Sequence, residues 1–281
     1  MTSENTHMLY VVATPIGNLG DISSRAVDVL RNVSMIAAED TRHTGQLLAH
    51  YGIRTRMIAY HDHNESGETP RLIAAMAAGE SIALVSDAGT PLVSDPGYRL
   101  VTAAAAAGIK VSPVPGASAL TAALSICALP VDRFCFEGFL PARPVARRER
   151  LSQLAGEQRT LVFYESPHRI GATLSDLAAA FGEERRVTIA RELTKQYEQA
   201  WYGTLTGALQ ALERSDVPAR GEFVLVLEGA PARASFNQEE VRAMEILLRE
   251  LSPSAAATLG SELLGVPRKR LYEVALSLKK V

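Results

Sequence analysis

Short apolar runs alternate with segments of helical periodicity through the first 129 residues of the chain. The run Ile-Ala-Leu-Val at 82–85 is typical of a strand buried inside a sheet. We predict strands at 9–13, 35–38, 56–60, 82–86 and 110–113. Helices are predicted at 23–32, 45–51, 69–78, 98–107 and 118–127. This alternation indicates βαβ units, and hence a parallel sheet with helices on both faces.

The alternation breaks at 128–132 and then resumes as a second α/β pattern. Strands are predicted at 134–139, 161–165, 187–192, 201–204 and 222–228, and helices at 146–154, 170–181 and 206–215. Residues 229–235 have the Ala, Pro and Ser content of a linker, and two or three short helices are predicted beyond them. We therefore predict an α/β fold with two α/β domains, 1–129 and 130–230, and a small helical extension at 236–281.

Composition and charge narrow the class of protein. Hydrophobic residues make up 47% of the chain, which is ordinary for a soluble globular protein. The 29 basic and 31 acidic residues nearly balance, so the total charge does not indicate a nucleic-acid partner. Cys127 and Cys135 are too few for a zinc site or a disulfide scaffold, which favours a reducing, cytoplasmic compartment. No membrane span is expected, because no apolar stretch reaches the required ~18 residues, and the first seven residues lack a signal pattern.

The stretch 86–97 is the most informative part of the chain. It follows the buried run at 82–85 and contains Asp87, Gly89 and Thr90. Small residues and a carboxylate at the end of a strand leave a crevice where a ligand contacts bare backbone, and ligands of open α/β sheets bind in such crevices. Asp95 is predicted to cap the next helix, with Pro96 at its first position. The alternative role for Asp87 is a loop cap.

Two further glycine-bearing loops follow strands of the same predicted sheet. The loop at 14–20 includes Pro15 and Gly17, and the loop at 115–118 ends in Ser118. The first is neither a dinucleotide fingerprint nor a Walker A loop, because the spacing and the lysine are missing. We expect all three loops to face one edge of the sheet and to share a ligand. The alternative is that they are plain strand-to-helix turns.

Titratable side chains gather where other strands end. Glu39, Asp40, Arg42 and His43 follow the second strand, and a His-Asp-His run at 61–63 follows the third. In the second half of the chain, polar and titratable side chains also follow strands, at 165–169 and 191–195. Such clusters favour a site formed between the two halves. No metal is expected, since no further ligand is placed to complete a tetrahedral set with the two histidines. A solvated loop is the alternative for each cluster.

Two basic clusters stand out against the neutral total. The first, over 141–159, contains Arg143, Arg147, Arg148, Arg150 and Arg159. The second follows Gly265 within 259–272, a stretch with helix–turn–helix rhythm, and contains Arg268, Lys269 and Arg270, with Lys279 and Lys280 further on. Helices of this kind dock on nucleic acid with their N-terminal turn. The alternative is an ordinary solvated helical hairpin.

Several of these stretches together resemble a known family. They are 14–21, 38–44, 61–65, 86–97, 115–119, 163–169, 190–198 and 221–229, in this order. The pattern is similar to the tetrapyrrole-methylase superfamily of S-adenosylmethionine-dependent methyltransferases, and within it to the bacterial 16S ribosomal RNA (cytidine-2′-O)-methyltransferases. The resemblance covers about residues 8–230, and the terminal helices resemble that group's helix–turn–helix extension.

The resemblance implies a bilobal fold that holds S-adenosyl-L-methionine in a cleft between two α/β domains. By position, the implied cofactor contacts from both domains are Pro15, Gly17, Asp87, Gly89, Thr90, Ser118, Ala119, Tyr164 and Glu222. Other members carry a denser glycine loop after the first strand, which Pro15 and Ile16 interrupt here. The implied partner is 16S ribosomal RNA within the small ribosomal subunit, and the implied assembly is a homodimer.

Methyl transfer to a ribose hydroxyl requires a general base, because the hydroxyl is a poor nucleophile until its proton is withdrawn. Glu39, Asp40, His43 and Glu165 are the candidate bases, and the sequence does not choose among them. Arg42 or Arg169 would hold a flanking phosphate. A 2′-hydroxyl target requires RNA rather than DNA.

Two rival functions remain open at this point. One is a methyltransferase of the same fold that acts on a tetrapyrrole ring carbon. The basic segment 141–159 and the terminal helices argue against it, since a small macrocycle needs neither. The other is a nucleic-acid-binding protein without catalysis, against which the density of titratable groups in the expected cleft weighs.

Overall fold

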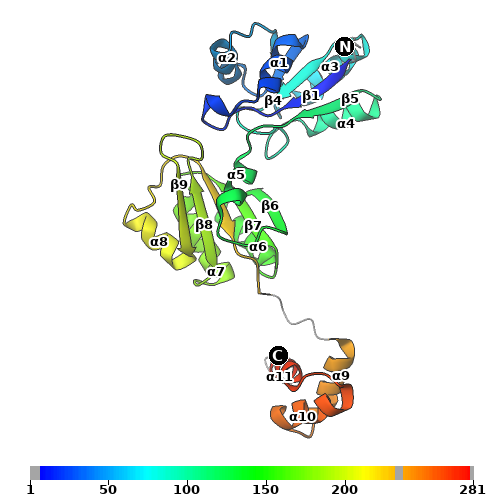
Figure 1. The fold of residues 1–281 in the computed structure, drawn as a ribbon, viewed down its shortest axis with the longest axis vertical. Helices are drawn as coiled ribbons and strands as arrows, with labels where there is room; N and C mark the ends of the chain where they lie inside the picture. Colours follow the sequence, from blue (N-terminus) through cyan, green and yellow to red (C-terminus); the bar gives the residue numbers. More distant parts are fainter. Residues whose placement is uncertain (1–6, 232–236, 279–281) are drawn as a thin grey trace. The chain divides into compact units, whose positions relative to one another are not determined.

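The structure is a computed structural model that describes residues 7–231 and 237–278. Contacts between residues divide the chain into two compact units, Met1–Ala230 and Pro231–Val281. The first unit contains two β-sheets and the second is helical (Figure 1). The contacts therefore place both predicted α/β regions in one unit, while the boundary predicted between them at 129/130 stays a prediction.

The first sheet is fully parallel, as its alternating pattern predicts. Its strands are β1 (Met8–Val12), β2 (Met35–Ala38), β3 (Met57–Ala59), β4 (Ile82–Val85) and β5 (Lys110–Val114), in the spatial order β3-β2-β4-β1-β5. The helices between them are α1 (Ser24–Asn32), α2 (Thr41–His50), α3 (Glu65–Ala77) and α4 (Tyr98–Ala106), and a 3-10 turn spans Leu19–Asp21. Side chains of α1 and α2 pack on one face of the sheet, and those of α3 and α4 pack on the other. Both faces are thus buried, which explains the nearly unbroken apolar runs.

Two helix starts and one helix cap differ from the sequence-based expectation. Helix α2 begins four residues early because the Asp40 carboxylate accepts a hydrogen bond from the Arg42 amide at 2.8 Å and caps it. Helix α3 also begins four residues early, at Glu65, and tolerates Pro70 within its second turn. The prediction that Asp95 caps α4 is wrong. Helix α4 begins at Tyr98, and Gly97, with φ of +131°, takes the capping position without a side-chain bond.

The second sheet is mixed. Its strands are β6 (Phe134–Phe139), β7 (Thr160–Glu165), β8 (Arg186–Arg191), β9 (Gln199–Thr204) and β10 (Phe223–Leu227), in the order β6-β7-β10-β8-β9. Only β6 and β7 pair in parallel, and the other pairs are antiparallel. Helices α6 (Pro144–Leu154), α7 (Ile170–Phe181) and α8 (Leu205–Glu213) cover one face. The apolar strand β10 lies at the centre of this sheet and is buried throughout.

Helix α5 (Ala119–Ile126) joins the two sheets within this unit. It follows β5 of the first sheet, and its Ala123 packs with Val162, Val224 and other residues on the free face of the second sheet (Figure 1). Ile16, from the loop after β1, belongs to the same apolar cluster. This cluster holds the loops of the first sheet against the strands of the second.

The C-terminal unit contains α9 (Gln238–Leu247), α10 (Pro253–Leu264) and α11 (Arg268–Leu278) around a small core of its own. Asn237 and Glu240 form a capping box at the start of α9. Gly265 ends α10 with φ of +64°, in the left-handed region that favours glycine. The turn predicted at Gly265 and the helix after it are confirmed. Across the residues that the structure describes, no helix is long and apolar enough to cross a membrane.

Candidate active site

The three glycine-bearing loops of the first sheet meet at one edge, as predicted. The Thr14 amide donates to the Gly89 carbonyl at 2.8 Å, and the Gly89 amide returns a bond to the Thr14 carbonyl at 3.1 Å. The Thr90 hydroxyl donates to the Ala117 carbonyl at 3.2 Å, which attaches the third loop. The loops therefore form one connected rim above the carboxyl ends of β1, β4 and β5.

A cavity of about 400 Å³ lies between this rim and the second sheet. Nine of the candidate residues named from the sequence line it: Glu39, Asp87, Gly89, Thr90, Ser118, Ala119, Tyr164, Glu165 and Glu222. Pro15, Gly17, Asp40, Arg42 and His43 are not among the lining residues. The structure thus brings candidates from both halves of the first unit together, as the strand-end clusters suggest.

One wall of the cavity is apolar and aromatic. The Tyr164 ring packs edge-on against Phe136 and Phe139, with centroids 4.9 and 5.6 Å apart. Ile16 and Leu193 extend this wall. Burial raises the pKa of the Tyr164 hydroxyl above its ordinary value. Such a wall suits a flat heteroaromatic group, which gains from both apolar burial and ring contact.

The opposite wall is acidic, and Glu39 and Asp87 hold each other in place through the backbone. The Asp87 amide donates to Glu39 Oε2 at 3.2 Å, and Asp87 Oδ1 accepts from the Asp40 amide at 3.0 Å. Burial raises the pKa of Glu39, and the Asp87 and Asp62 carboxylates add to the increase against the Asp87 amide bond. A cationic ligand beside these groups would stabilise their charged forms.

Asp95 is the third carboxylate of this wall, and sequence reasoning missed its place in the cavity. Burial raises its pKa to about 6, and the nearby Glu39 and Asp87 carboxylates contribute to the shift. Its backbone neighbours Leu92 and Ser94 have φ of +72° and +70°, a conformation that side-chain-bearing residues rarely adopt. Strain of this kind gathers at functional sites because the surrounding structure must hold it.

Glu165 has a different environment at the end of β7. It is 2% exposed, and its two oxygens accept from the Thr173 hydroxyl at 2.6 Å and the Ser166 amide at 2.7 Å. The Arg169 guanidinium lies 3.3 Å from the same carboxylate. All of these contacts fix the carboxylate in the loop after β7 and satisfy its oxygens within the protein.

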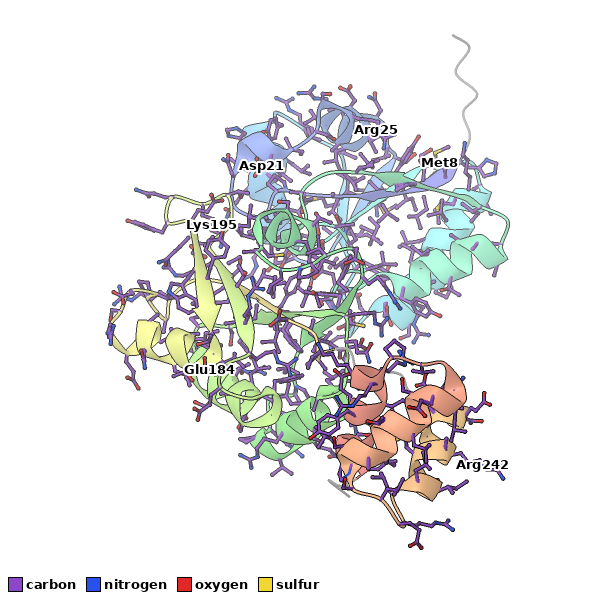
Figure 2. The ribbon with its side chains drawn as sticks, turned by 60° about the horizontal axis from the view of Figure 1, so that its bottom comes forward. Met8, Asp21, Arg25, Glu184, Lys195 and Arg242 are labelled. Atoms are coloured by element: carbon purple, nitrogen blue, oxygen red, sulfur yellow. The ribbon has the colours of Figure 1, made fainter. Side chains whose placement is uncertain are left out.

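Lys195 is a second residue that sequence reasoning did not single out as a candidate. It lies on the connection between β8 and β9 (Figure 2), where its Nζ contacts Glu192 Oε1 and Glu222 Oε2, each at 2.9 Å. Its side chain packs over Gly17, where a Cβ atom would collide with it. Glu222, proposed as a cofactor contact, therefore has its carboxylate bound to a lysine of its own domain. The bare backbone at Gly17 makes room for that lysine.

Three of the candidate catalytic residues lie beside the cavity rather than in it. Asp40 caps α2, and its carboxylate pairs with the exposed Arg42 guanidinium at 2.9 Å. The Arg42 hydrogen bonds lower the pKa of Asp40 to about 2. His43 is exposed on the first turn of α2. Asp40 is thus a helix cap whose environment favours its ionised form over proton uptake.

The basic cluster at 141–159 is largely neutralised within the domain. Four of its arginines lie within 4 Å of a carboxylate: Arg147 and Arg148 of Asp176, Arg150 of Glu137, and Arg159 of Glu157. Arg147 is buried, 2.7 Å from Asp176. The cluster therefore offers less free positive charge than its sequence suggests, and among the described residues Arg143 is its exposed member outside these ion pairs.

The histidine pair does not form part of a ligand set. The rings of His61 and His63 lie 5.9 Å apart, edge to face. Within residues 7–231 and 237–278, no group of three or more His, Cys, Asp or Glu side chains is arranged to hold a metal ion. Both cysteines are free.

Comparison with known protein families gives two matches. Residues 8–209 match the family described as tetrapyrrole (corrin/porphyrin) methylases. Residues 235–279 match the domain described as the RsmI C-terminal HTH domain. The two matched ranges follow the division of the chain into an α/β unit and a helical unit.

Individual proteins are similar over nearly the whole chain. The chain is 56% identical over 265 residues to ribosomal RNA small subunit methyltransferase I of Xylella fastidiosa, covering 94% of this chain and 97% of that protein. It is 51% identical over 276 residues to the protein of the same name from Synechocystis sp., with 97% and 98% covered. The solved structure of uroporphyrin-III-C-methyltransferase from Thermus thermophilus aligns with a TM-score of 0.56 at 21% identity, covering 79% of this chain and 94% of that one. This last likeness concerns the fold.

Proposed function

We propose that this chain, which belongs to the tetrapyrrole (corrin/porphyrin) methylase family, transfers a methyl group from S-adenosylmethionine to a cytidine ribose 2′-oxygen of 16S ribosomal RNA. The observation that carries the proposal is identity of about half or more, over nearly full length, to proteins named ribosomal RNA small subunit methyltransferase I. The cavity adds a physical reason, because its two walls differ in chemistry as the two ends of that cofactor do.

The cofactor fits the cavity by its chemical parts. When bound, it supplies an electrophilic methyl group on a cationic sulfur. Tyr164 and the apolar wall suit the adenine ring, and Gly89, Thr90, Ser118 and Ala119 bring backbone and small side chains close to it. The acidic wall of Glu39 and Asp87 suits the positive charge. Pro15 and Gly17 shape the adjoining loop, and Lys195 with Glu222 closes the cavity on the side of the second sheet.

Orientation is the main contribution that the protein makes to this reaction, since the reactive carbon belongs to the cofactor. The rim of hydrogen-bonded loops and the buried Glu165 network keep the two walls in register. Carboxylates that face the cavity are available to accept the proton of the attacking hydroxyl, and Glu39 is one of them. The well-bonded Glu165 and the capping Asp40 are assigned to positioning in this proposal.

The C-terminal unit is proposed to contact the RNA through the start of α11. The structure separates the roles of its three basic residues. Arg268 donates to Thr258 and Ser254 on α10, and Arg270 pairs with Glu240 at 2.9 Å, whereas Lys269 is exposed. Lys279 and Lys280 lie outside the described residues. Lys269 is therefore the residue through which a phosphate contact is best tested, because its replacement leaves the bonds of Arg268 and Arg270 within the unit in place.

The cellular setting belongs to the same proposal. We propose that the protein works in the cytoplasm as a homodimer, on RNA assembled in the small ribosomal subunit. Two free cysteines suit a reducing compartment. Size-exclusion chromatography with light scattering tests the dimer, and a monomer at micromolar concentration would contradict it.

Mass spectrometry of ribosomal RNA nucleosides tests the reaction. A strain that lacks this protein should lose one 2′-O-methylcytidine from its 16S RNA, and the purified enzyme with S-adenosylmethionine should restore it. Loss of a methyl group from a base atom would overturn the assigned acceptor. Methylation of a tetrapyrrole by the purified enzyme, with RNA left unmodified, would favour the rival activity of the same fold.

A salt titration of RNA binding tests the role of the C-terminal unit. Lys269→Glu should weaken binding to small-subunit particles and lower the slope of log affinity against log salt by about one, because one phosphate contact releases about one counterion. Arg249→Glu, at an exposed position after α9, is the charge-matched control and should have a smaller effect. Equal effects of the two variants would contradict docking through α11.

A further inference from the structure

A second cavity of about 530 Å³ adjoins the first and is formed by other elements. Its walls come from the start of α3 and the first two turns of α4, and include Asp62, Glu65, Tyr98, Arg99 and Thr102. Asp95 lines both cavities, and within residues 7–231 and 237–278 it is the residue that the two linings share. A group that enters from the second cavity therefore meets the first one at the Asp95 carboxylate.

The loop that carries Asp95 is fixed by close packing on both sides. A Cβ atom at Gly97 would come within 2.6 Å of the Leu84 side chain in β4, so the loop lies directly on the first sheet. A Cβ atom at Gly138 in β6 would come within 2.9 Å of the Ser94 hydroxyl, so the same loop also touches the second sheet. Asp95 lies between these two contact points, Ser94 and Gly97, and directly follows the strained residue Ser94. This packing sets the position of Asp95 rather than leaving it to a free loop.

The second cavity has the chemistry of a nucleoside site in a polynucleotide. Tyr98 is 76% exposed beside it and presents an aromatic face on which a base can stack. Arg99 is 57% exposed in its side chain and is held by Glu65 at 3.0 Å, which fixes a cation in the lining of the same cavity. An open cavity with one exposed aromatic ring and one oriented guanidinium suits a strand that continues beyond the bound nucleoside.

We propose that the target ribose enters through the second cavity and that Asp95 is the general base of the methyl transfer. This inference rests on the function proposed above. The 2′-oxygen forms a bond to the methyl carbon as the carbon–sulfur bond breaks, and that bond's electron pair stays on sulfur, which becomes a neutral thioether. The 2′-hydroxyl proton passes to the Asp95 carboxylate, which becomes a neutral carboxylic acid and later releases the proton to water.

The charges around Asp95 give the reaction a defined pH dependence. Glu39, Asp87 and Tyr164 face it from the first cavity, and Asp62, Glu65 and Arg99 line the second. Burial, followed by the Glu39 and Asp87 carboxylates, raises its pKa to about 6. A carboxylate with this pKa is a stronger base than an ordinary aspartate and is still ionised at neutral pH. The rate should therefore fall as pH drops below about 6.

The decisive experiment compares Asp95→Asn with the wild-type enzyme on small ribosomal subunits from the strain that lacks the protein. Loss of a general base lowers methyl transfer by roughly 100-fold or more. Binding of S-adenosylmethionine, measured by calorimetry, should change only a few-fold. Asp95→Glu, which keeps a carboxylate, should recover part of the rate, and the thermal melting temperature reports whether each variant is folded.

The pH profile separates Asp95 from its neighbour Glu39. In the wild-type enzyme and in Glu39→Gln, kcat/KM should rise with pH through a limb near 6. In Asp95→Asn the residual rate should lack this limb. A folded Asp95→Asn variant with an unchanged rate or an unchanged limb would overturn the assignment, and so would loss of the limb in Glu39→Gln alone.

A second variant tests the entry route on its own. Tyr98→Ala should raise KM for the small-subunit substrate about tenfold, because one base loses the aromatic ring on which it stacks, and should leave S-adenosylmethionine affinity unchanged. An unchanged KM would overturn the second cavity as the entry site. Failure of the proposed function has a different signature, because the wild-type enzyme would then leave the ribose 2′-oxygen unmethylated whatever residue stands at position 95.

Discussion

The two sheets of the first unit both end in carboxylates at the cavity, but they hold them in opposite ways. On the first sheet, Glu39 and Asp95 are half-buried among other acids, and their pKa values are raised. On the second, Glu165 is bonded to Thr173, Ser166 and Arg169, and Glu192 and Glu222 share Lys195. Burial acts to raise the pKa of Glu192, yet Lys195 and the Glu222 amide lower it on balance. The first sheet thus holds carboxylates whose burial opposes their charged form, and the second holds carboxylates that are bonded to its own loops.

The largest expected difference between the carboxylates of the two sheets is in their contribution to the free energy of unfolding. Glu165→Ala should lower the free energy of unfolding by about 3–5 kcal/mol, because it leaves the Arg169 charge, the Thr173 hydroxyl and the Ser166 amide without their buried acceptor. Glu39→Ala, at the matching strand end of the first sheet, should cost clearly less, since its burial opposes the charged form. Urea denaturation measures both. Equal losses would break the contrast.

A smaller effect is expected on cofactor binding. Asp87→Ala should weaken S-adenosylmethionine binding by about 1.5–3 kcal/mol, tenfold or more, because a charge-assisted contact with the ligand is lost. Glu222→Ala should weaken it less, because its carboxylate is exposed and already bound to Lys195. Calorimetry on folded variants decides the order of the two effects, and the reverse order would move the cofactor's polar contacts to the second sheet.

Asp95→Asn should stabilise the protein at high pH. Folding raises the pKa of Asp95 from its ordinary value near 4 to about 6. The ionised carboxylate therefore destabilises the folded protein above about pH 6, and this destabilisation is absent below about pH 4, where the group is protonated in both states. After allowance for its partial exposure, the gain at pH 8 is about 1 kcal/mol. Urea denaturation at pH 8 and pH 4 checks this, and a variant less stable than wild type at pH 8 would contradict it.

Lys195→Met should have the smallest effect, with the opposite dependence on pH. The pKa of Glu192 is lowered in the folded protein, so the stabilisation from its pairing with Lys195 is present above the ordinary glutamate range and lost as pH falls through the folded value. The partly exposed pair is worth at most about 1 kcal/mol at neutral pH. The deficit of the variant should vanish near pH 3. A deficit that persists there would assign the effect to packing on Gly17.

The sequence was most informative where a local pattern of apolar residues or a glycine determines the secondary structure. The apolar runs locate every strand of both sheets to within one or two residues at either end, including β3, β5, β6 and β9, which are only partly buried. The left-handed turn at Gly265 follows from its neighbours. The order of the second sheet was not predicted, since nothing local indicates that β10, last in the chain, lies at its centre. Antiparallel pairing at such separation is a tertiary property.

The roles of individual side chains were predicted wrongly where the same residue type can either cap a helix or face a cavity. The sequence Asp95-Pro96 has the composition of a helix cap, but the positive φ of Ser94 and Gly97 turns the carboxylate toward the cavities instead. Asp40 shows the reverse case, a candidate base that caps a helix. The partner of Arg147 is 29 residues away on α7, so no local count of charges reveals that the arginine is neutralised.

The paired hydrogen bonds between Thr14 and Gly89 link segments that are 75 residues apart, and Thr90 extends the link to Ala117. Opening any one of these loops requires bonds to the next loop to break, so we expect the rim to open and close as one cooperative element. A ligand that contacts only one loop should then slow hydrogen exchange in all three, including backbone that it never touches.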